Sequence, residues 1–199
     1  MNNPQRYTKV AIILHWLIAL MIFGMFAVGW FMADLPKDAP KVASFDLFDL
    51  GLYMVQLPEA ISPRSYYFNL HKSFGVMVLA LVLFRIYWKL THKAPALPAS
   101  IIGWQRKAAS ASHHLLYMLM FLMPASGLIM ATYSKYGVKW FGIPLIKGLD
   151  NEPLREVFKS AHEAIAVILI SLIAIHVLAA LKHKFVDKDE VMGRMTSCD

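Results

Sequence analysis

Four of the eight histidines in this chain are spaced in a way that suits two redox metal centres: His15, His71, His162 and His176. His162 and His176 are 14 residues apart. In a helix, that spacing places two side chains within roughly 40° of the same face and about 21 Å apart along the axis. One helix would therefore present two imidazoles on one side, one near each surface of a membrane.

The other two histidines of this set match those two depths. His71 pairs with His162 near the outer surface, and His15 pairs with His176 near the inner surface. Two facing pairs inside a helix bundle are what two bis-histidine haems require, because neutral imidazole is a good axial ligand and two such ligands saturate the iron for electron transfer. Hydrogen bonds from each histidine to a neighbouring helix are the alternative. A single zinc centre needs converging ligands, which a separation of about 21 Å disfavours.

The composition indicates which elements must position these histidines. The 199 residues are 58% hydrophobic and 17% charged, whereas an ordinary soluble domain has about 45–50% apolar and about 25% charged residues. This excess indicates exposure to lipid and excludes a disordered chain. It also excludes a disulfide scaffold, because Cys198 is the single cysteine. The formal net charge of +7 is typical of cytoplasmic loops in a membrane protein, so no nucleic-acid partner is expected.

Four stretches are apolar and long enough to cross a bilayer as helices, at about residues 10–33, 67–90, 112–133 and 160–182. We expect an all-α transmembrane four-helix bundle that holds haem in its core, with the whole chain (1–199) in one domain. Basic residues gather in the second loop and at both ends, so the positive-inside rule predicts that both termini face the cytoplasm, although the third loop is also basic. The first loop is too apolar for a solvated linker and predicts a short amphipathic segment at the interface.

Six stretches resemble the bacterial cytochrome b561 family, which is related to the cytochrome b subunits of nickel–iron hydrogenases. They are Arg6-Tyr7 followed by AIILHWLIAL (11–20), YFNLHKSFG (67–75), LFRIYWKL (83–90), SHHLLYMLMFLMPASGLIM (112–130), SAHEAIA (160–166) and IHVLAALKHKFVDKDEVMGRM (175–195). The resemblance implies a four-helix, di-haem cytochrome of the bacterial inner membrane whose iron ligands are His15, His71, His162 and His176. The sequence has no CxxCH attachment motif, so two non-covalent b-type haems are expected.

One type of member in that family is a superoxide oxidase, which passes electrons from superoxide on the periplasmic side to ubiquinone on the cytoplasmic side. The resemblance makes this reaction the leading hypothesis, with lipid, quinone and a periplasmic electron donor as partners. The first loop is longer than in the compact form of that enzyme and would cover the outer haem. That length favours a second hypothesis, a non-catalytic electron-transfer subunit docked to a periplasmic dehydrogenase or hydrogenase-type partner. A structural bundle, the third hypothesis, requires that no haem be present.

Polar residues near the spans are candidates for secondary roles. His113 is the family's non-ligand histidine at the start of the third span, where it either bonds or relays a proton to a quinone or lies at the interface. Arg85 is a candidate for contact with a haem propionate, as Lys72 is on the outer side, and interfacial anchoring is the alternative. Lys182 and His183 either border a quinone pocket or anchor the helix end. A set of outer basic residues would steer an anion such as superoxide, although acids lie nearby: Arg64, Lys72, Lys135, Lys139 and Lys159.

Overall fold

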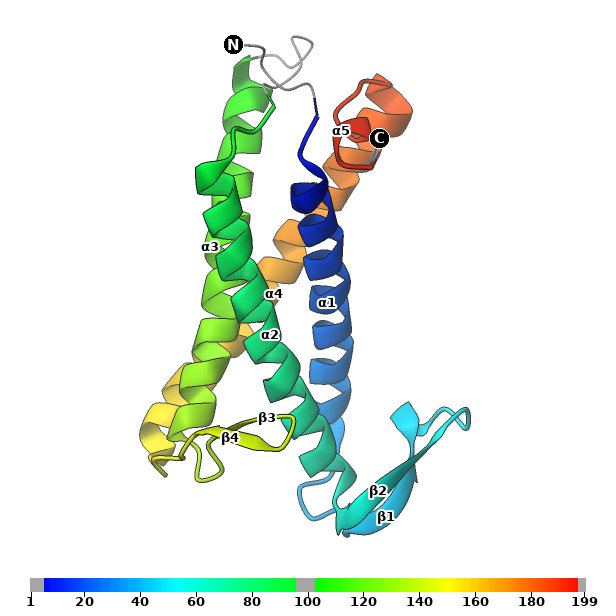
Figure 1. Cartoon of the computed structure of the whole chain (residues 1–199), viewed down its shortest axis with the longest axis vertical. Coiled ribbons are helices and arrows are strands. Elements are labelled where there is room, and N and C mark those ends of the chain that lie inside the picture. The colour runs from blue at the N-terminus through cyan, green and yellow to red at the C-terminus, as the bar shows by residue number, and fades with distance from the viewer. Residues whose placement is uncertain (1–5, 96–102, 197–199) are drawn as a thin grey trace.

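The computed structural model describes residues 6–95 and 103–196, and Cys198 lies outside these ranges. Four long helices dominate the described chain (Figure 1): α1 (Lys9–Asp34), α2 (Pro63–Thr91), α3 (Gly103–Tyr133) and α4 (Glu152–Lys182). Each is long and apolar enough to cross a membrane. The predicted all-α transmembrane four-helix architecture is therefore confirmed.

The helices extend beyond the apolar spans because polar residues start them. The side chains of Thr8, Ser62 and Asn151 accept hydrogen bonds from backbone N–H groups in the first turns of α1, α2 and α4, respectively. These bonds satisfy amides that have no partner inside the helix. Proline also stands in the first turn of α2 and of α4, where its missing N–H costs nothing.

Two small apolar clusters hold the bundle together. Ile18 and Ile22 of α1 pack on α2 at Val78 and Val82. The other cluster joins α3 to α4 and contains Leu116, Leu119 and Leu169. Outside these seams many large apolar side chains are exposed, which suits a protein whose outer surface faces lipid. α3 and α4 diverge toward the end of the bundle where the described chain begins and ends, as do α1 and α2 (Figure 1).

Two antiparallel hairpins lie at the opposite end of the bundle (Figure 1). The first joins α1 to α2 and pairs β1 (Val42–Asp46) with β2 (Met54–Ile61). The second joins α3 to α4 and pairs β3 (Val138–Trp140) with β4 (Ile143–Ile146). We call this end of the bundle the hairpin end, and the other end the terminal end.

The first hairpin is held by aromatic side chains on one side and is exposed on the other. Phe48 lies against Phe31 and Tyr67 with ring centroids 5.2 and 5.4 Å apart, and its backbone N–H donates to the Tyr67 hydroxyl at 2.8 Å. The apolar segment predicted in the first loop is thus a β-hairpin. Its turn exposes a row of apolar side chains, including Leu52, which is 82% exposed.

The second hairpin is fixed to α2 through one buried serine. The Ser73 hydroxyl accepts from the backbone N–H of Phe141 at 2.9 Å, and Phe74 packs edge-on against Phe141. Lys72 also reaches this hairpin, since its ammonium donates to the Gly137 carbonyl at 3.1 Å. Gly137 has φ +62, and a Cβ there would overlap the carbonyl of Ile146, so this turn requires glycine.

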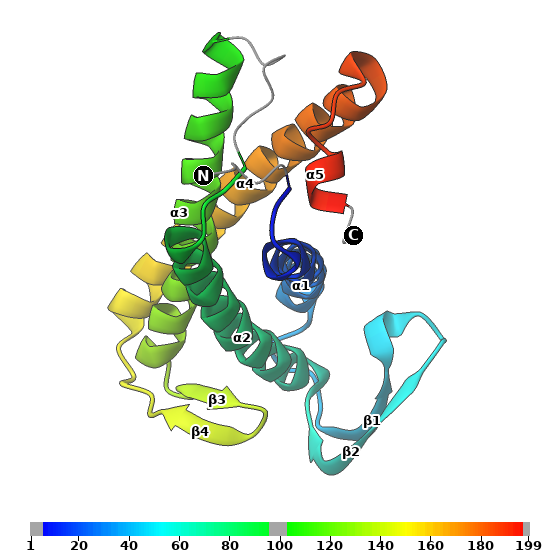
Figure 2. The ribbon, with the colours of Figure 1, turned by 45° about the horizontal axis from the view of Figure 1, so that its top comes forward.

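A short tail follows α4 and folds back toward α1 at the terminal end (Figure 2). It consists of a π-helical turn, η2 (His183–Asp187), and one turn of helix, α5 (Gly193–Thr196). The Trp16 indole N–H donates to the carbonyl of Met195 at 2.8 Å. The tail therefore lies beside the part of α1 that carries His15.

Candidate functional site

The four histidines singled out by their spacing lie in two pairs, one toward each end of the bundle. His71 of α2 and His162 of α4 face each other toward the hairpin end, with ring centroids 6.4 Å apart. His15 of α1 and His176 of α4 face each other toward the terminal end, with centroids 6.3 Å apart. We call these the hairpin pair and the terminal pair. The structure thus brings together the residues that the depth argument pairs, and their role as ligands stays a prediction.

The separation within each pair leaves room for one metal ion between two imidazoles. Metal–nitrogen bonds are about 2 Å long and the ligating nitrogen lies about 1 Å from its ring centre, so two imidazoles that share one ion have centroids roughly 6 Å apart. The observed 6.3 and 6.4 Å match this value. Direct hydrogen bonds between the two rings of a pair, by contrast, are absent from the described residues.

Glycines let the helices approach the hairpin pair closely. A Cβ on Gly127 of α3 would lie 2.8 Å from Cε1 of His162, and one on Gly29 of α1 would lie 3.3 Å from Cε1 of His71. An apolar cavity of about 170 Å³ opens beside His71, between Met21, Gly24, Met25 and Val28 of α1 and Leu70 and Phe74 of α2. A slot with flat glycine walls, apolar lining and a buried imidazole suits the face of a macrocycle.

The two rings of the hairpin pair have different partners at Nδ1. His162 Nδ1 lies 3.0 Å from the Met123 carbonyl and 3.1 Å from the Ser126 hydroxyl. The carbonyl can only accept, so Nδ1 carries the proton and Nε2 is left for a metal. His71 Nδ1 is buried without a hydrogen-bond partner. A buried polar atom of this kind indicates that its site is completed by another group.

Cationic and aromatic side chains surround the terminal pair. The buried Arg85 guanidinium of α2 donates to the Ala11 carbonyl at 3.2 Å and lies 3.1 Å from Nδ1 of His15. Lys89, one turn further along α2, places its ammonium 4.0 Å from the ring centre of Tyr117. Burial raises the pKa of the Tyr7 phenol, as does its proximity to Tyr117, so Tyr7 remains a hydrogen-bond donor at neutral pH.

His113 lies against the terminal pair, with its ring centroid 5.5 Å from that of His176. Its Nδ1 donates to the Ala109 carbonyl at 2.6 Å, which leaves Nε2 as the nitrogen that can accept a proton. The neighbouring His114 makes the same bond to the Ser110 carbonyl, at 2.7 Å. The two histidines thus share a backbone environment, and the ring contact with His176 distinguishes His113.

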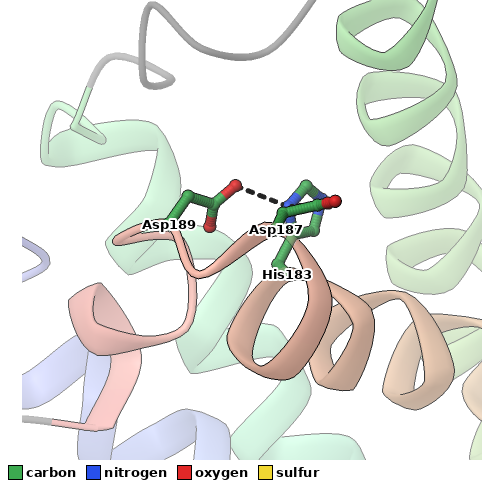
Figure 3. Close-up of side chains that lie close together, drawn as sticks. All are labelled: His183, Asp187 and Asp189. Atoms are coloured by element: carbon green, nitrogen blue, oxygen red, sulfur yellow. Dashed lines mark hydrogen bonds and ion pairs between the residues drawn. The ribbon is translucent and has the colours of Figure 1, made fainter.

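Lys182 and His183 form ion pairs within the tail (Figure 3). The Lys182 ammonium lies 2.6 Å from the Asp187 carboxylate, and His183 Nδ1 lies 2.7 Å from that of Asp189. His183, Asp187 and Asp189 together have the donor atoms of a metal site, but these carboxylates already bind Lys182 and His183. The group therefore stabilises the turn after α4.

Several of the outer basic residues are also engaged. The Arg64 guanidinium donates to the carbonyls of Met32 and Leu35 at the end of α1, and Lys159 pairs with Glu156 at 3.4 Å. The pair with Glu156 offsets the positive charge of Lys159 at the hairpin end, whereas Arg64 keeps its charge because the carbonyls are neutral. Sequence reasoning missed Tyr7 and Ser126 as neighbours of the two pairs. Ser126 could have been singled out from the sequence, because it is a polar residue inside an apolar span.

Residues 6–197 match the family model described as prokaryotic cytochrome b561. The chain belongs to this family. Cytochrome b561 homolog 2 of Escherichia coli (strain K12) is 31% identical over 199 residues, covering 98% of this chain and 93% of that protein. Cytochrome b561 homolog 1 of the same strain is 28% identical, covering 96% and 97%, respectively. A probable superoxide oxidase CybB of Yersinia pestis is 25% identical, covering 96% of each chain.

Membership in this family confirms the main predictions about the class of protein. The chain is a multi-pass cytochrome of the inner membrane that transfers electrons as an oxidoreductase and binds b-type haem. The histidine pairs fit that group in separation, burial and wall shape. Haem supplies one-electron exchange at its iron, and the residues of this chain supply the ligands and the surrounding charge.

Proposed function

We propose that this cytochrome carries two b-type haems and moves electrons from superoxide, at the hairpin end, to ubiquinone, at the terminal end. His71 and His162 hold one haem, and His15 and His176 hold the other. Both termini face the cytoplasm, so the hairpins face the periplasm. The observation that carries the proposal is the presence of two histidine pairs, 6.4 and 6.3 Å between centroids, at opposite ends of one bundle.

The two half-reactions place different demands on the two ends. Two superoxide ions give two electrons and two molecules of oxygen, and no proton is exchanged. Ubiquinone takes those two electrons together with two protons to form ubiquinol. His113 suits that step, since its ring lies against that of His176, its Nδ1 is engaged with the Ala109 carbonyl, and its Nε2 can bind and release a proton.

Arg85 is a candidate partner for a haem propionate in this proposal. Its guanidinium is buried beside His15, and a planar fork of N–H donors matches a carboxylate. Lys72 is the corresponding candidate at the hairpin end, although its ammonium donates to Gly137 in this structure. α4 carries one proposed ligand of each haem, His162 and His176.

Single alanine replacements of the four histidines test the proposed ligand pairs. The wild type is expected to bind two haems per chain, measured as pyridine haemochrome against protein. His71→Ala and His162→Ala remove the same spectral component, and His15→Ala and His176→Ala remove the other. His114→Ala is the matched control, because it removes an imidazole of α3 without changing either pair. Any other grouping of the four variants refutes the pairing.

A second function, electron transfer for a docked periplasmic partner, is favoured by the first hairpin. Its turn exposes Leu50, Leu52, Tyr53 and Met54, and a contiguous apolar surface is typical of a protein contact. Superoxide generated beside the pure protein separates the two functions. Rapid haem reduction, followed by ubiquinol formation, supports the oxidase. Haems that stay oxidised with superoxide but are reduced by dithionite exclude it and favour the docked subunit.

A further inference from the structure

We infer that Arg85 gives electron transfer its direction, by making the terminal pair hold an electron more strongly than the hairpin pair. This inference rests on the proposed ligand pairs. It assigns Arg85 as a residue that acts through its charge on the redox centre, as the alternative to the propionate contact, in which a carboxylate would neutralise that charge.

The first observation is that Arg85 brings an uncompensated positive charge to the terminal pair. Its side chain is buried, with 9% of its surface exposed. Its guanidinium bonds to the Ala11 carbonyl and to His15, and none of the carboxylates in the described ranges forms an ion pair with it. The guanidinium is close enough to act electrostatically on both His15 and His176. Arginine stays protonated at any working pH, so this charge is permanent.

The second observation is that the hairpin pair lacks such a cation among the described residues. The charged group that acts on His162 is the carboxylate of Glu163. The ammonium of Lys72, next to His71 in sequence, is turned toward Gly137 in the second hairpin. The charged side chains that act on the two pairs therefore differ in sign.

The partner of His162 at Nδ1 acts in the same direction as these charges. His162 donates from Nδ1 to the Met123 carbonyl, and such a bond makes imidazole a more basic ligand, which favours oxidised iron.

A positive charge beside a redox centre stabilises the form that has gained an electron. The effect is stronger inside a membrane protein than in water, because the low dielectric screens it less. Charge and hydrogen bonding thus both raise the reduction potential of the terminal pair relative to that of the hairpin pair. Electrons then move spontaneously from the hairpin end to the terminal end, where the proposed quinone reduction occurs.

Spectroelectrochemical titration of the purified, haem-loaded protein tests this inference. Each site is measured alone, the terminal site in His71→Ala and the hairpin site in His176→Ala. The terminal site is expected to have the higher potential, and a lower one overturns the inference without any change at Arg85. Arg85→Gln is then expected to weaken reduction of the terminal site at least tenfold, which is about 59 mV for one electron.

Two matched variants separate charge from structure. Arg85→Lys keeps the positive charge and is expected to retain most of the potential, so an equal fall in Arg85→Lys and Arg85→Gln overturns the inference. Arg64→Gln makes the same chemical change at the other end of α2, where Arg64 bonds to the end of α1. It should change the potential of neither haem site by as much as Arg85→Gln changes that of the terminal site. Failure of the proposed function gives a different result, namely missing haem or other ligand groupings in the alanine series.

Discussion

Replacing Gly127 by alanine tests the geometry of the hairpin pair with a single methyl group. The new Cβ would lie 2.8 Å from Cε1 and 3.1 Å from Nδ1 of His162, well inside normal van der Waals contact. The helix cannot yield locally, because Ser126 and Met123 of the same turn hold His162 at Nδ1. The imidazole must therefore rotate away from the position in which it faces His71.

The sign of the stability change is informative. In a helix interior, glycine to alanine normally stabilises by about 1 kcal/mol. Overpacking of a close contact costs about 1–3 kcal/mol, so at Gly127 the clash exceeds the helical gain. At Gly29 the corresponding contact is 3.3 Å, and at Gly24 nothing lies within 4 Å. The three substitutions thus form a series in which the expected damage falls from Gly127 to Gly29 to Gly24.

Haem content and thermal unfolding in detergent measure this series. Gly127→Ala is expected to lose at least half of the component assigned to the hairpin pair and to keep the terminal one. Gly29→Ala should show a smaller loss of the same component, and Gly24→Ala should load two haems with equal or higher stability. Equal haem content and stability in Gly127→Ala and Gly24→Ala would refute the closeness of α3 to His162.

Three further substitutions test how the loops and the tail are held. Ser73→Ala leaves the Phe141 N–H without its acceptor, which costs about 1–3 kcal/mol and should speed amide exchange over 138–146. Tyr67→Phe removes the hydroxyl bonded to Phe48, costs about 0.5–1.5 kcal/mol, and should speed exchange over 42–61 alone. Trp16→Phe removes the indole bond to the tail, which should make proteolysis after residue 187 faster without changing haem content.

The spans and the two histidine pairs could be predicted because each depends on local regularities. Helical rise and periodicity relate His162 to His176 on one element, and bilayer thickness limits where the other two histidines can lie. The predicted spans fall inside the observed helices, which continue past them. The apolar pattern ends near the interface, whereas helical hydrogen bonds and caps at residues such as Ser62 do not depend on lipid.

The hairpins were not predicted, because apolar loop residues fit a segment that lies at the membrane interface as well as they fit a hairpin. The alternation of exposed and less exposed positions in β2, together with Gly51 in the turn, is typical of a hairpin. The apolar residues of the first loop have two roles that composition cannot separate. Phe48 packs on Phe31 and Tyr67, while Leu52 faces outward.

The contact between Arg85 and His15 depends on how α1 and α2 pack, so no local pattern predicts it. The two residues are 70 positions apart in the chain, and depth alone places Arg85 level with the terminal pair. Tyr7 is a similar case, since its place before α1 puts it at the terminal end, but only the packing of the helices brings Tyr117 near it. Such contacts determine charge at the site, which is why sequence could suggest the ligands but not their electrostatics.

In the proposed reaction, the proton demand of each half-reaction supports the direction of transfer independently of charge. Superoxide gives up an electron without exchanging a proton, so its end of the protein needs no acid or base. Ubiquinone must gain protons, and the terminal pair has His113 beside it with a free Nε2. The hairpin pair is instead flanked by an apolar cavity and glycine walls. A proton-consuming acceptor therefore suits the terminal end, and reversed flow would place proton chemistry where the lining is apolar.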